Sequence, residues 1–495
     1  MLRKIRIALA VIVITLITLL FVDFTGTLHT YLGWMAKIQF LPAVLALNAV
    51  VIIGLILLTL ICGRIYCSVI CPLGIMQDIL SHINRKKNRF SYSPAINWLR
   101  YLMLAILAIS IAAGIGSLTA LLAPYSSYGR MAQSILQPIY LGINNLLTMA
   151  AEEMDSYAFY HREVWIRSMP TLIVAVVSFA IVTLLAVKGG RTYCNTICPV
   201  GTILGFLSRF SWFKIVIDAD ACKNCRKCER NCKASCIDIQ NHKVDYSRCV
   251  ACGNCLGQCS FGAIKYAHSQ NPGSSAATED NNNVKTTDDG RRNFLIGAGM
   301  AVAGTALAQE KKKVDGGLAV IEDKIQPKRH TPILPPGAIS ADNMSRRCTA
   351  CQLCVSECPN DVLRPSTDLM TMMQPMMSYE KGYCRPECNR CSSVCPAGAI
   401  KPITLADKSS IQIGHAIWVK KNCVAVADGA ECGNCARHCP TGAIQMVHPN
   451  GDESLPMIPA VNEARCIGCG ACEYVCPSRP YSAIYVEGHE VHREN

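Results

Sequence analysis

Closely spaced cysteines constrain the fold of this chain more than any other feature of its sequence. Four cysteines in the order C-x2-C-x2-C-x3-C, or in a close variant with a longer first gap, occur six times. The six runs are Cys222, Cys225, Cys228 and Cys232; Cys249, Cys252, Cys255 and Cys259; Cys348, Cys351, Cys354 and Cys358; Cys384, Cys388, Cys391 and Cys395; Cys423, Cys432, Cys435 and Cys439; and Cys466, Cys469, Cys472 and Cys476. In bacterial ferredoxins each such run gives three thiolates to one 4Fe–4S cluster and the fourth to the neighbouring cluster. The sequence therefore predicts six 4Fe–4S clusters in small α+β domains.

Zinc is the alternative occupant of a cysteine-rich segment. Zinc sites usually consist of two separated cysteine pairs, not of triplets with a fourth cysteine three residues on. In the first two runs the ferredoxin rule predicts crosswise ligation. Under that rule Cys259 joins the first three cysteines of the first run, and Cys232 joins those of the second. Cys236 is left over and is interpreted as a small buried thiol.

Four apolar stretches precede residue 190, and each is long enough to cross a bilayer as a helix. They are Ile5–Val22, Leu41–Ile61, Ile96–Ala120 and Thr171–Val187. Buried core helices are the alternative. Basic residues crowd the N-terminus and the segments after the second and fourth stretches, which the positive-inside rule assigns to the cytoplasm. We expect a four-helix transmembrane bundle over residues 1–214 and a cytoplasmic two-cluster domain over residues 215–268.

An export-type signal lies inside the chain. Arg291 and Arg292 precede the 15-residue apolar run Phe294–Ala308, as in a twin-arginine signal, which moves folded proteins. A plain fifth span is the alternative, and both readings place the residues after 309 outside. The remaining domains we expect are a flexible linker over 269–290, a single signal or anchor helix over 291–309, a tether over 310–340 and a periplasmic four-cluster domain over 341–495.

Two further cysteine pairs belong to an internal repeat. The segments GRIYCSVICPLGIMQDILS (Gly63–Ser81) and GRTYCNTICPVGTILGFLS (Gly190–Ser208) match at ten of nineteen positions. If each C-x3-C begins a helix, its cysteines lie at i and i+4 on one face. A pseudo-two-fold bundle then brings four thiols together at the inner edge of the membrane, which predicts a seventh iron–sulfur centre. Packing thiols and redox-active disulfides are the alternatives. The four cysteines are Cys67, Cys71, Cys194 and Cys198.

These motifs together resemble two known proteins joined in one chain. Residues 1–267 resemble the membrane subunit of the quinol dehydrogenase that serves periplasmic nitrate reductase, by their four apolar stretches, two C-x3-C-P motifs and two-cluster segment. Residues 290–490 resemble its periplasmic ferredoxin-type partner, by the twin-arginine segment, the PPGAI stretch at Pro335–Ile339 and four cysteine runs. The resemblance implies a bacterial inner-membrane protein that oxidises menaquinol or ubiquinol from the membrane quinone pool. It also implies electron delivery to a periplasmic reductase or cytochrome c, which the sequence does not identify.

The resemblance further implies nested ligation in the C-terminal domain, with sequential pairing of the runs as the alternative. In the nested arrangement Cys476 joins Cys348, Cys351 and Cys354; Cys439 joins Cys384, Cys388 and Cys391; Cys395 joins Cys423, Cys432 and Cys435; and Cys358 joins Cys466, Cys469 and Cys472.

A quinol site requires an apolar slot and groups that accept protons. The outer loops offer His29, Lys37, Gln39, His161 and Glu163 as candidates. Ordinary polar loop residues are the alternative interpretation for each of them.

The sequence also excludes some classes of function. A formal net charge of +13 does not indicate a nucleic-acid partner, because six oxidised clusters with their thiolates add roughly −12. The sequence contains neither a C-x-x-C-H haem-attachment motif nor a convincing P-loop or dinucleotide fingerprint. We therefore interpret the chain as an electron conduit. A membrane iron–sulfur regulator or metallocentre-maturation factor, and a structural scaffold, are the alternatives.

The internal signal can be tested by its two arginines. We expect replacement of both Arg291 and Arg292 by Lys to leave the C-terminal domain in the cytoplasm, because twin-arginine export requires the pair. Reporter fusions after Ser269 and after Gln309 measure sidedness in the parent and the variant. Unchanged export of the variant would identify the segment as a plain fifth span.

Overall fold

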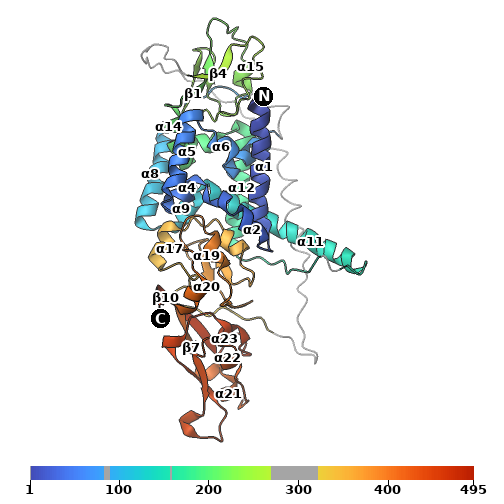
Figure 1. Ribbon diagram of the computed structural model, residues 1–495, viewed down its shortest axis with the longest axis vertical. Coiled ribbons are helices and arrows are strands. Elements are labelled where there is room, and N and C mark those ends of the chain that lie inside the picture. The colour runs from blue at the N-terminus through green and yellow to red at the C-terminus, as the bar shows by residue number, and fades with distance from the viewer. Residues whose placement is uncertain (1, 83–89, 157–158, 269–321, 495) are drawn as a thin grey trace.

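The computed structural model describes residues 2–82, 90–156, 159–268 and 322–494. Figure 1 shows three parts stacked along the long axis. A small domain with β1 and β4 lies at one end, the long helices occupy the middle, and the C-terminal domain lies at the other end. The predicted linker over 269–290 and the predicted signal helix over 291–309 lie outside the described residues.

The middle part contains the four predicted apolar stretches, all of them helical. Two form single helices, α1 (Leu2–Val22) and α12 (Met169–Gly189), which are long and apolar enough to cross a membrane. The second stretch is split into α4 (Phe40–Leu45) and α5 (Ala49–Cys62), and the third into α8 (Asn97–Ala113) and α9 (Gly116–Leu122).

Local backbone chemistry explains both interruptions. Between α4 and α5, Leu47 has a φ of 55°, and the Asn48 side chain accepts a hydrogen bond from the Val51 amide to begin α5. Gly114 ends α8 with a φ of 71°, a left-handed conformation that glycine adopts without a Cβ penalty. Uninterrupted helices over Leu41–Ile61 and Ile96–Ala120 were therefore wrong predictions.

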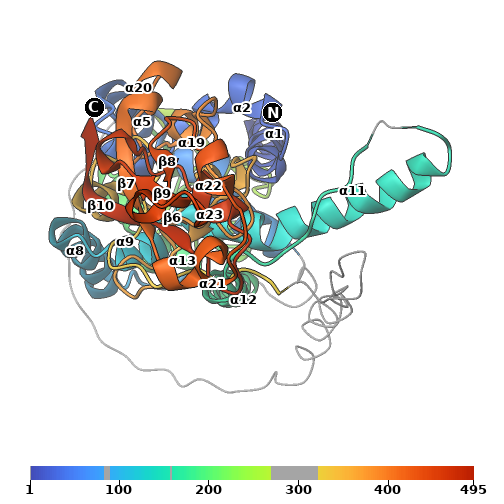
Figure 2. The same ribbon diagram turned by 90° about the horizontal axis from the view of Figure 1, so that it is seen from below.

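Short helices fill the space between the long ones. Each C-x3-C-P motif forms two of them, with proline at the first position of the second helix. Between α9 and α12 the chain forms α10, one π-helical turn η1, and α11, which points away from the body in Figures 1 and 2. The short helices are α2 (Thr27–Leu32), α3 (Trp34–Lys37), α6 (Tyr66–Val69), α7 (Pro72–Leu80), α10 (Pro124–Met131), η1 (Ala132–Leu136), α13 (Thr192–Thr196) and α14 (Pro199–Ser208). The α11 helix (Gln137–Glu152) is longer, with 16 residues.

The domain after α14 has the α+β character that the sequence predicts. β1 (Phe213–Ile217) pairs antiparallel with β4 (Ile264–His268), so the two ends of the domain meet in one sheet. β2 (Ile237–Asp238) pairs with β3 (Lys243–Val244), and α15 (Lys227–Arg230) lies between the strand pairs in sequence.

The C-terminal domain also combines short helices with two-stranded antiparallel sheets. The sheets pair β5 with β6, β8 with β9, and β7 with β10. Its elements are α17 (Ala341–Arg347), α18 (Leu353–Ser356), β5 (Leu363–Pro365), β6 (Pro375–Met377), α19 (Arg390–Val394), α20 (Leu405–Ser410), β7 (Ile411–Trp418), η2 (Lys420–Asn422), α21 (Val424–Ala427), α22 (Asn434–Arg437), β8 (Ile444–Val447), η3 (Pro449–Gly451), β9 (Ile458–Val461), η4 (Glu463–Arg465), α23 (Ala471–Val475) and β10 (Ile484–Glu494).

The predicted tether over 310–340 is wrong for its described part, because residues 322–340 pack against the C-terminal domain. Ile333 and Leu334 lie in the core, at 0% and 6% exposure. Arg329 reaches Glu473 at 2.6 Å, and both side chains are buried. The proline and charge content that suggested a linker instead serves these specific buried contacts.

The Arg329–Glu473 pair yields a stability prediction. We expect Arg329→Ala to destabilise the C-terminal domain by about 3–5 kcal/mol, because Glu473 remains buried without its partner. Burial already raises the pKa of Glu473, and Arg329 opposes that rise. Without Arg329 this pKa rises further, so the loss of stability grows as the pH rises from 5 to 8 and more of the buried carboxyl must ionise.

Limited proteolysis of the full chain at residues 322–332, across this pH range, measures the effect. Arg346→Ala is the matched control, because Arg346 forms an exposed pair with Asp342, which contributes little. Equal protease sensitivity of the two variants would contradict the expected role of the buried pair.

Candidate iron–sulfur sites

The first two cysteine runs line two separate cavities, each with a crosswise set of thiols. One cavity is lined by Cys222, Cys225, Cys228 and Cys259. The other is lined by Cys232, Cys249, Cys252 and Cys255. These are the two groupings that the ferredoxin spacing predicts, and each offers four sulfur donors around an internal space. Within the described residues, no three His, Cys, Asp or Glu side chains are close enough to hold a single metal ion.

Cys236 lies in the second of these cavities, a position that the sequence reasoning did not assign to it. It is 1% exposed, and its Sγ is 3.5 Å from Sγ of Cys232. The prediction of a small buried thiol is therefore incomplete, because this thiol adjoins a proposed ligand. Its spacing of four residues after Cys232 was the available signal.

In the C-terminal domain the structure brings neighbouring runs together, not the nested partners. Burial raises the pKa of Cys348, Cys351 and Cys354, and the charge of Cys395 raises it further in each case, so Cys395 lies beside them. Cys358 shares a cavity with Cys384, Cys388 and Cys391.

The last two runs pair in the same sequential way. The pKa of Cys435 is raised to about 11 by burial and by the charges of Cys432, Cys476 and Cys423. Cys439 likewise contributes to the raised pKa of Cys466 and of Cys469. The nested assignments of Cys476, Cys439, Cys395 and Cys358 are therefore corrected. Compact two-run modules explain the difference, because each run folds against the run nearest to it along the chain.

The four thiol groups of this domain adjoin one another in a row. Cys391 adds to the pKa of Cys354, which places the first module's two groups side by side. The Cys384 amide donates to the Cys469 carbonyl at 3.0 Å, joining the first module to the second. Cys435 lies within electrostatic reach of Cys472. In Figure 1 the row runs from α19, near the long helices, toward α22 and α23.

The two C-x3-C-P motifs meet in the middle part, and their four thiols converge as predicted. All four cysteines are buried, at 3–4% exposure. Burial raises the pKa of Cys198, and the charges of Cys194, Cys71 and Cys67 add to it. However, the cysteines of one motif do not share a continuous helix. Cys67 lies in α6 and Cys71 caps α7, while Cys194 lies in α13 and Cys198 caps α14, so the predicted i, i+4 geometry is wrong.

Two arginines tie the repeats to each other in a symmetric way. Arg64 precedes Cys67 by three residues, and Arg191 precedes Cys194 by three. Nη2 of Arg64 donates to the Cys194 carbonyl at 3.3 Å, and Nη1 of Arg191 donates to the Cys67 carbonyl at 2.5 Å. Both arginines are 0% exposed. Each repeat thus supplies the cation that organises the cysteine loop of the other.

Glycines at matching positions allow this close approach. A Cβ on Gly74 would lie 2.3 Å from the Cys67 carbonyl oxygen and 3.0 Å from Nη1 of Arg191. A Cβ on Gly201 would lie 2.2 Å from the Cys194 carbonyl oxygen and 2.9 Å from Nη2 of Arg64. The glycine in each C-P-x-G segment therefore makes room for the guanidinium of the opposite repeat.

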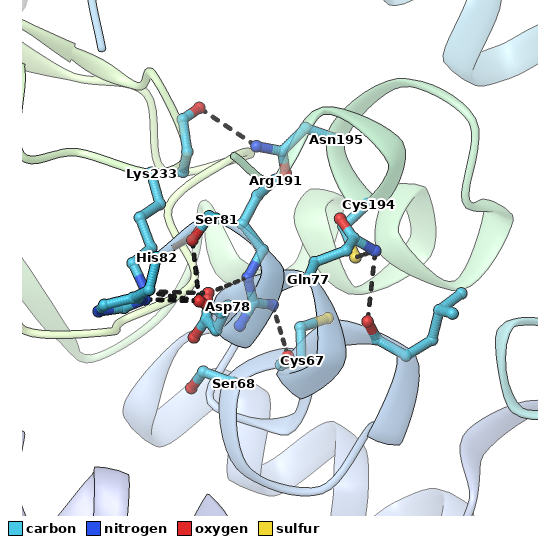
Figure 3. A network of polar contacts seen from close by, with 12 residues as sticks. Cys67, Ser68, Gln77, Asp78, Ser81, His82, Arg191, Cys194, Asn195 and Lys233 are labelled. Atoms are coloured by element: carbon cyan, nitrogen blue, oxygen red, sulfur yellow. Dashed lines mark hydrogen bonds and ion pairs between the residues drawn. The ribbon is translucent and has the colours of Figure 1, made fainter. Parts of the chain in front are cut away.

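The two repeats differ in the negative charge beside their arginines, because Arg191 has a carboxylate partner and Arg64 has none among the described residues. Asp78 binds Arg191 at 2.8 Å and lies 3.6 Å from Nζ of Lys233 (Figure 3). It also binds Arg6 at 2.9 Å. Burial favours a raised pKa for Asp78, but these three cations outweigh it and hold the pKa below its usual range. The position equivalent to Asp78 is Gly205, and no carboxylate among the described residues pairs with Arg64. A buried cation beside convergent sulfurs fits an anionic iron–sulfur centre.

We call the four cysteines Cys67, Cys71, Cys194 and Cys198 the thiol quartet. Arg64 also links this thiol quartet to the first ferredoxin domain. Its Nη1 donates to the Ser247 carbonyl at 2.8 Å, and it lies within electrostatic reach of Cys249. Gln77 from α7 lies on the quartet as well, with its amide nitrogen 3.2 Å from Sγ of Cys194. Gln77, Arg64 and Arg191 are site residues that the sequence reasoning missed, although the repeated G-R-x-Y-C segment contained the signal for the arginines.

On the other side of the quartet, Arg130 joins the middle part to the C-terminal domain. It is 0% exposed, and its Nη1 donates to the Ala120 carbonyl at 2.9 Å and lies 3.5 Å from the Ala350 carbonyl. Cys351 and Tyr193 are both within its electrostatic reach. The buried Arg130 guanidinium therefore lies between Tyr193 of the second repeat and Cys351 in the first cysteine run of the C-terminal domain.

The five quinol-site candidates are scattered. Gln39 is buried and accepts a hydrogen bond from Tyr66 at 3.0 Å, so it supports the first repeat. Lys37 and His161 are exposed. Glu163 lines a cavity beside Cys358.

His29, the remaining candidate, is buried against the C-terminal domain. Its Nε2 is 3.0 Å from both the Leu20 carbonyl and Glu357, and its hydrogen bond goes to Leu20. Burial lowers the pKa of His29 and raises that of Glu357 to about 7. His29 therefore lies at the contact between the long helices and the C-terminal domain.

Comparisons with known families agree with the cysteine geometry. A family described as a 4Fe-4S binding domain matches residues 44–89 and 171–217, which contain the two C-x3-C-P motifs. A second 4Fe-4S binding domain matches residues 242–265, and a 4Fe-4S dicluster domain matches residues 430–479. The dicluster match spans most of the last two runs together, in agreement with their pairing in the structure.

Several curated proteins are similar to parts of the chain. The methylamine utilization ferredoxin-type protein MauM of Methylobacillus flagellatus is 31% identical over 32% of this chain and 70% of its own length. The ferredoxin-type protein NapH of Escherichia coli is 27% identical over 44% of this chain and 67% of its own. The uncharacterized protein MJ0749 of Methanocaldococcus jannaschii is 39% identical over 15% of this chain and 30% of its own. No solved structure matches the chain.

The close crossing of the repeats yields a prediction. We expect Gly74→Ala to destabilise the thiol quartet, because its Cβ has no room beside the Cys67 carbonyl and Arg191. A cost of about 1–3 kcal/mol is typical for such overpacking. Gly54→Ala in α5 is the control, because a Cβ there meets nothing within 4 Å. Thermal unfolding and iron content of the two variants provide the measurement, and equal values would contradict the crossing geometry.

Proposed function

Because the chain belongs to the family of ferredoxin-type electron-transport proteins that includes NapH and MauM, we propose that it is a membrane-bound quinol dehydrogenase and electron conduit. It oxidises menaquinol or ubiquinol from the quinone pool of a bacterial inner membrane. It passes the electrons through 4Fe–4S clusters to a periplasmic reductase or a cytochrome c. Residues 215–290 lie in the cytoplasm, and residues 310–495 lie in the periplasm.

The row of sulfur groups along the long axis is the observation that carries this proposal. It begins in the first ferredoxin domain, continues through the thiol quartet, and ends in the four groups of the C-terminal domain. Buried cations lie at both joints of this row, Arg64 toward Cys249 and Arg130 toward Cys351. Positive charge between anionic clusters stabilises the added electron at each joint. The six ferredoxin-type groups hold six 4Fe–4S clusters in this proposal.

The thiol quartet holds a seventh iron–sulfur centre in the same proposal. Four thiolates crowded in a buried space repel one another, so they need a cationic metal core as a partner. Arg64, which has no carboxylate partner among the described residues, supplies further compensation for the net negative charge of such a centre. The match of a 4Fe-4S binding domain to both C-x3-C-P repeats supports this assignment.

Spectroscopy on the purified full chain tests the conduit. We expect anaerobically prepared protein to contain more than about 24 iron atoms and to show cluster reduction when menaquinol is added. A double variant, Cys67→Ser with Cys194→Ser, should lose the iron in excess of six clusters and one paramagnetic signal, while the six ferredoxin-type clusters remain.

Cys62→Ser is the matched control, because Cys62 lies outside the repeat. Stoichiometric zinc with little iron would overturn the iron–sulfur assignment. Iron and spectra equal to those of the parent in the double variant would remove the seventh centre only. Absence of reduction by menaquinol, with full reduction by dithionite, would contradict quinol oxidation.

A further inference from the structure

We infer that quinol binds in a cavity at the outer side of the long helices, between the base of α11 and the C-terminal domain. This inference rests on the proposed function and assigns it a site. The cavity encloses about 780 Å³ of empty space, part of which is open to solvent. Its walls come from five places in the chain: Phe24 in the loop after α1, the η1–α11 junction, the loop before α12, the start of α12, and the segment that carries Cys358.

The cavity adjoins a proposed cluster. Cys358 and Pro359 line it, and the same two residues line the cavity formed with Cys384, Cys388 and Cys391. A molecule bound here is therefore separated from the second cluster group of the C-terminal domain by one cysteine side chain. Of the five quinol-site candidates, Glu163 is the one that lines this cavity in the described part of the chain.

Two glutamines supply polar groups suited to a quinol ring. Gln133 and Gln137 line the cavity and are 6% and 3% exposed. Gln133 Oε1 accepts from Ser134, and Gln137 Oε1 is 3.5 Å from Nη1 of Arg167, but neither amide nitrogen donates a hydrogen bond within the described protein. Amide groups can accept from the hydroxyls of a quinol and donate to the carbonyls of the quinone.

Both glutamines lie at a π-helical turn, Gln133 within η1 and Gln137 directly after it. η1 (Ala132–Leu136) interrupts the regular helical hydrogen bonding between α10 and α11, and such turns are frequent at functional sites. Gln133 and Gln137 lie four residues apart, so they share one side of the helix. Both line the cavity together with Arg167 and Trp165 from the loop before α12.

The α11 helix, which follows η1, exposes an apolar face beside the cavity, and this indicates that lipid reaches the cavity. On α11 the polar residues Asn144 and Thr148 are buried, at 8% and 2% exposure, whereas Ile143 and Leu146 are 53% and 67% exposed. Asn144 donates to the Tyr160 carbonyl, so the polar face packs on the returning chain. A helix that exposes its apolar face needs an apolar surrounding. In Figure 2 it extends sideways from the body, as a helix lying along a membrane surface would.

This arrangement fits an amphiphilic ligand with a polar ring and an apolar tail. The ring lies between the glutamines and Cys358, and the tail leaves past Leu141 and Leu172 toward the lipid beside α11. A water-soluble metabolite would not require a lipid-facing helix at the entrance. A quinol from the membrane has both halves of the required chemistry.

Both O–H bonds of one quinol break, giving the quinone, two electrons and two protons. Cys358, Cys384, Cys388 and Cys391 would hold the iron–sulfur cluster that takes up these electrons, one at a time, for delivery to the outer redox protein. The protons leave through the Glu163 carboxylate, whose side chain is 62% exposed and paired with Lys381, into outer water.

Binding of a quinol analogue to the full-length protein tests the site without relying on turnover. The probe is 2-heptyl-4-hydroxyquinoline N-oxide, whose fluorescence is quenched on binding. For the double variant Gln133→Leu with Gln137→Leu we expect about tenfold weaker binding, the loss of roughly one good hydrogen bond in a water-poor site. Leu172→Trp, which narrows the cavity without removing a polar group, should weaken binding as well.

Gln445→Leu is the matched control, because Gln445 is exposed on β8 far from the cavity, and its affinity should equal that of the parent. Full reduction by dithionite in every variant shows that the clusters are intact. Parent-like probe binding in both cavity variants would overturn this inference while leaving the proposed function intact. If menaquinol fails to reduce the parent, the proposed function itself fails. Lost binding in Gln39→Leu alone would move the site to the thiol quartet.

Discussion

Two buried guanidinium groups hold the centre of this molecule together. Arg64 and Arg191 each cross from one repeat to the cysteine loop of the other, donating to the carbonyls of Cys194 and Cys67. Because an arginine has several donors in a rigid fork, each group also reaches a second partner, Ser247 for Arg64 and Asp78 for Arg191. The contacts between the repeats and the seating of the first ferredoxin domain thus depend on the same two side chains.

Burying these charges is costly unless opposite charge is close by. Asp78 provides the negative charge for Arg191, and the same carboxylate also lies beside Arg6 and Lys233. Arg64 and Arg130 have no carboxylate partner in the described part of the chain, yet both are fully buried beside cysteines. Anionic iron–sulfur centres would neutralise them, so the protein scaffold and the proposed cofactors stabilise each other.

The C-terminal domain also places cysteine runs beside a buried cation and beside a cavity. Its first cysteine run lies against Arg130, and its second lies against the cavity at the base of α11. Electrons can therefore enter the row of four groups from the thiol quartet or from a molecule in that cavity. Both routes lead toward the same end of the domain, which is the end farthest from the long helices in Figure 1.

The sequence by itself determined the kind of chemistry and its local units. Cysteine spacing predicted the crosswise sets in the first domain, because ligands two and three residues apart must fold around one small centre. The G-R-x-Y-C repeat predicted that four thiols would meet. Spacing could not decide how the four C-terminal runs pair, because each fourth cysteine fits any partner run that the fold brings close.

Other features were decided only by the tertiary structure. Residues 310–340 were predicted to be a tether because prolines and charges are common in linkers, but the described part packs on residues far away along the chain, such as Glu473 for Arg329 and Met377 for Ile333. The breaks in the second and third apolar stretches depend on single residues, Leu47 and Gly114, that a hydropathy average does not detect. Gln133 in η1 and Gln137 at the start of α11 became site candidates only because the fold places them at the same cavity as Cys358. Local spacing is a property of the chain, whereas long-range proximity is set by packing.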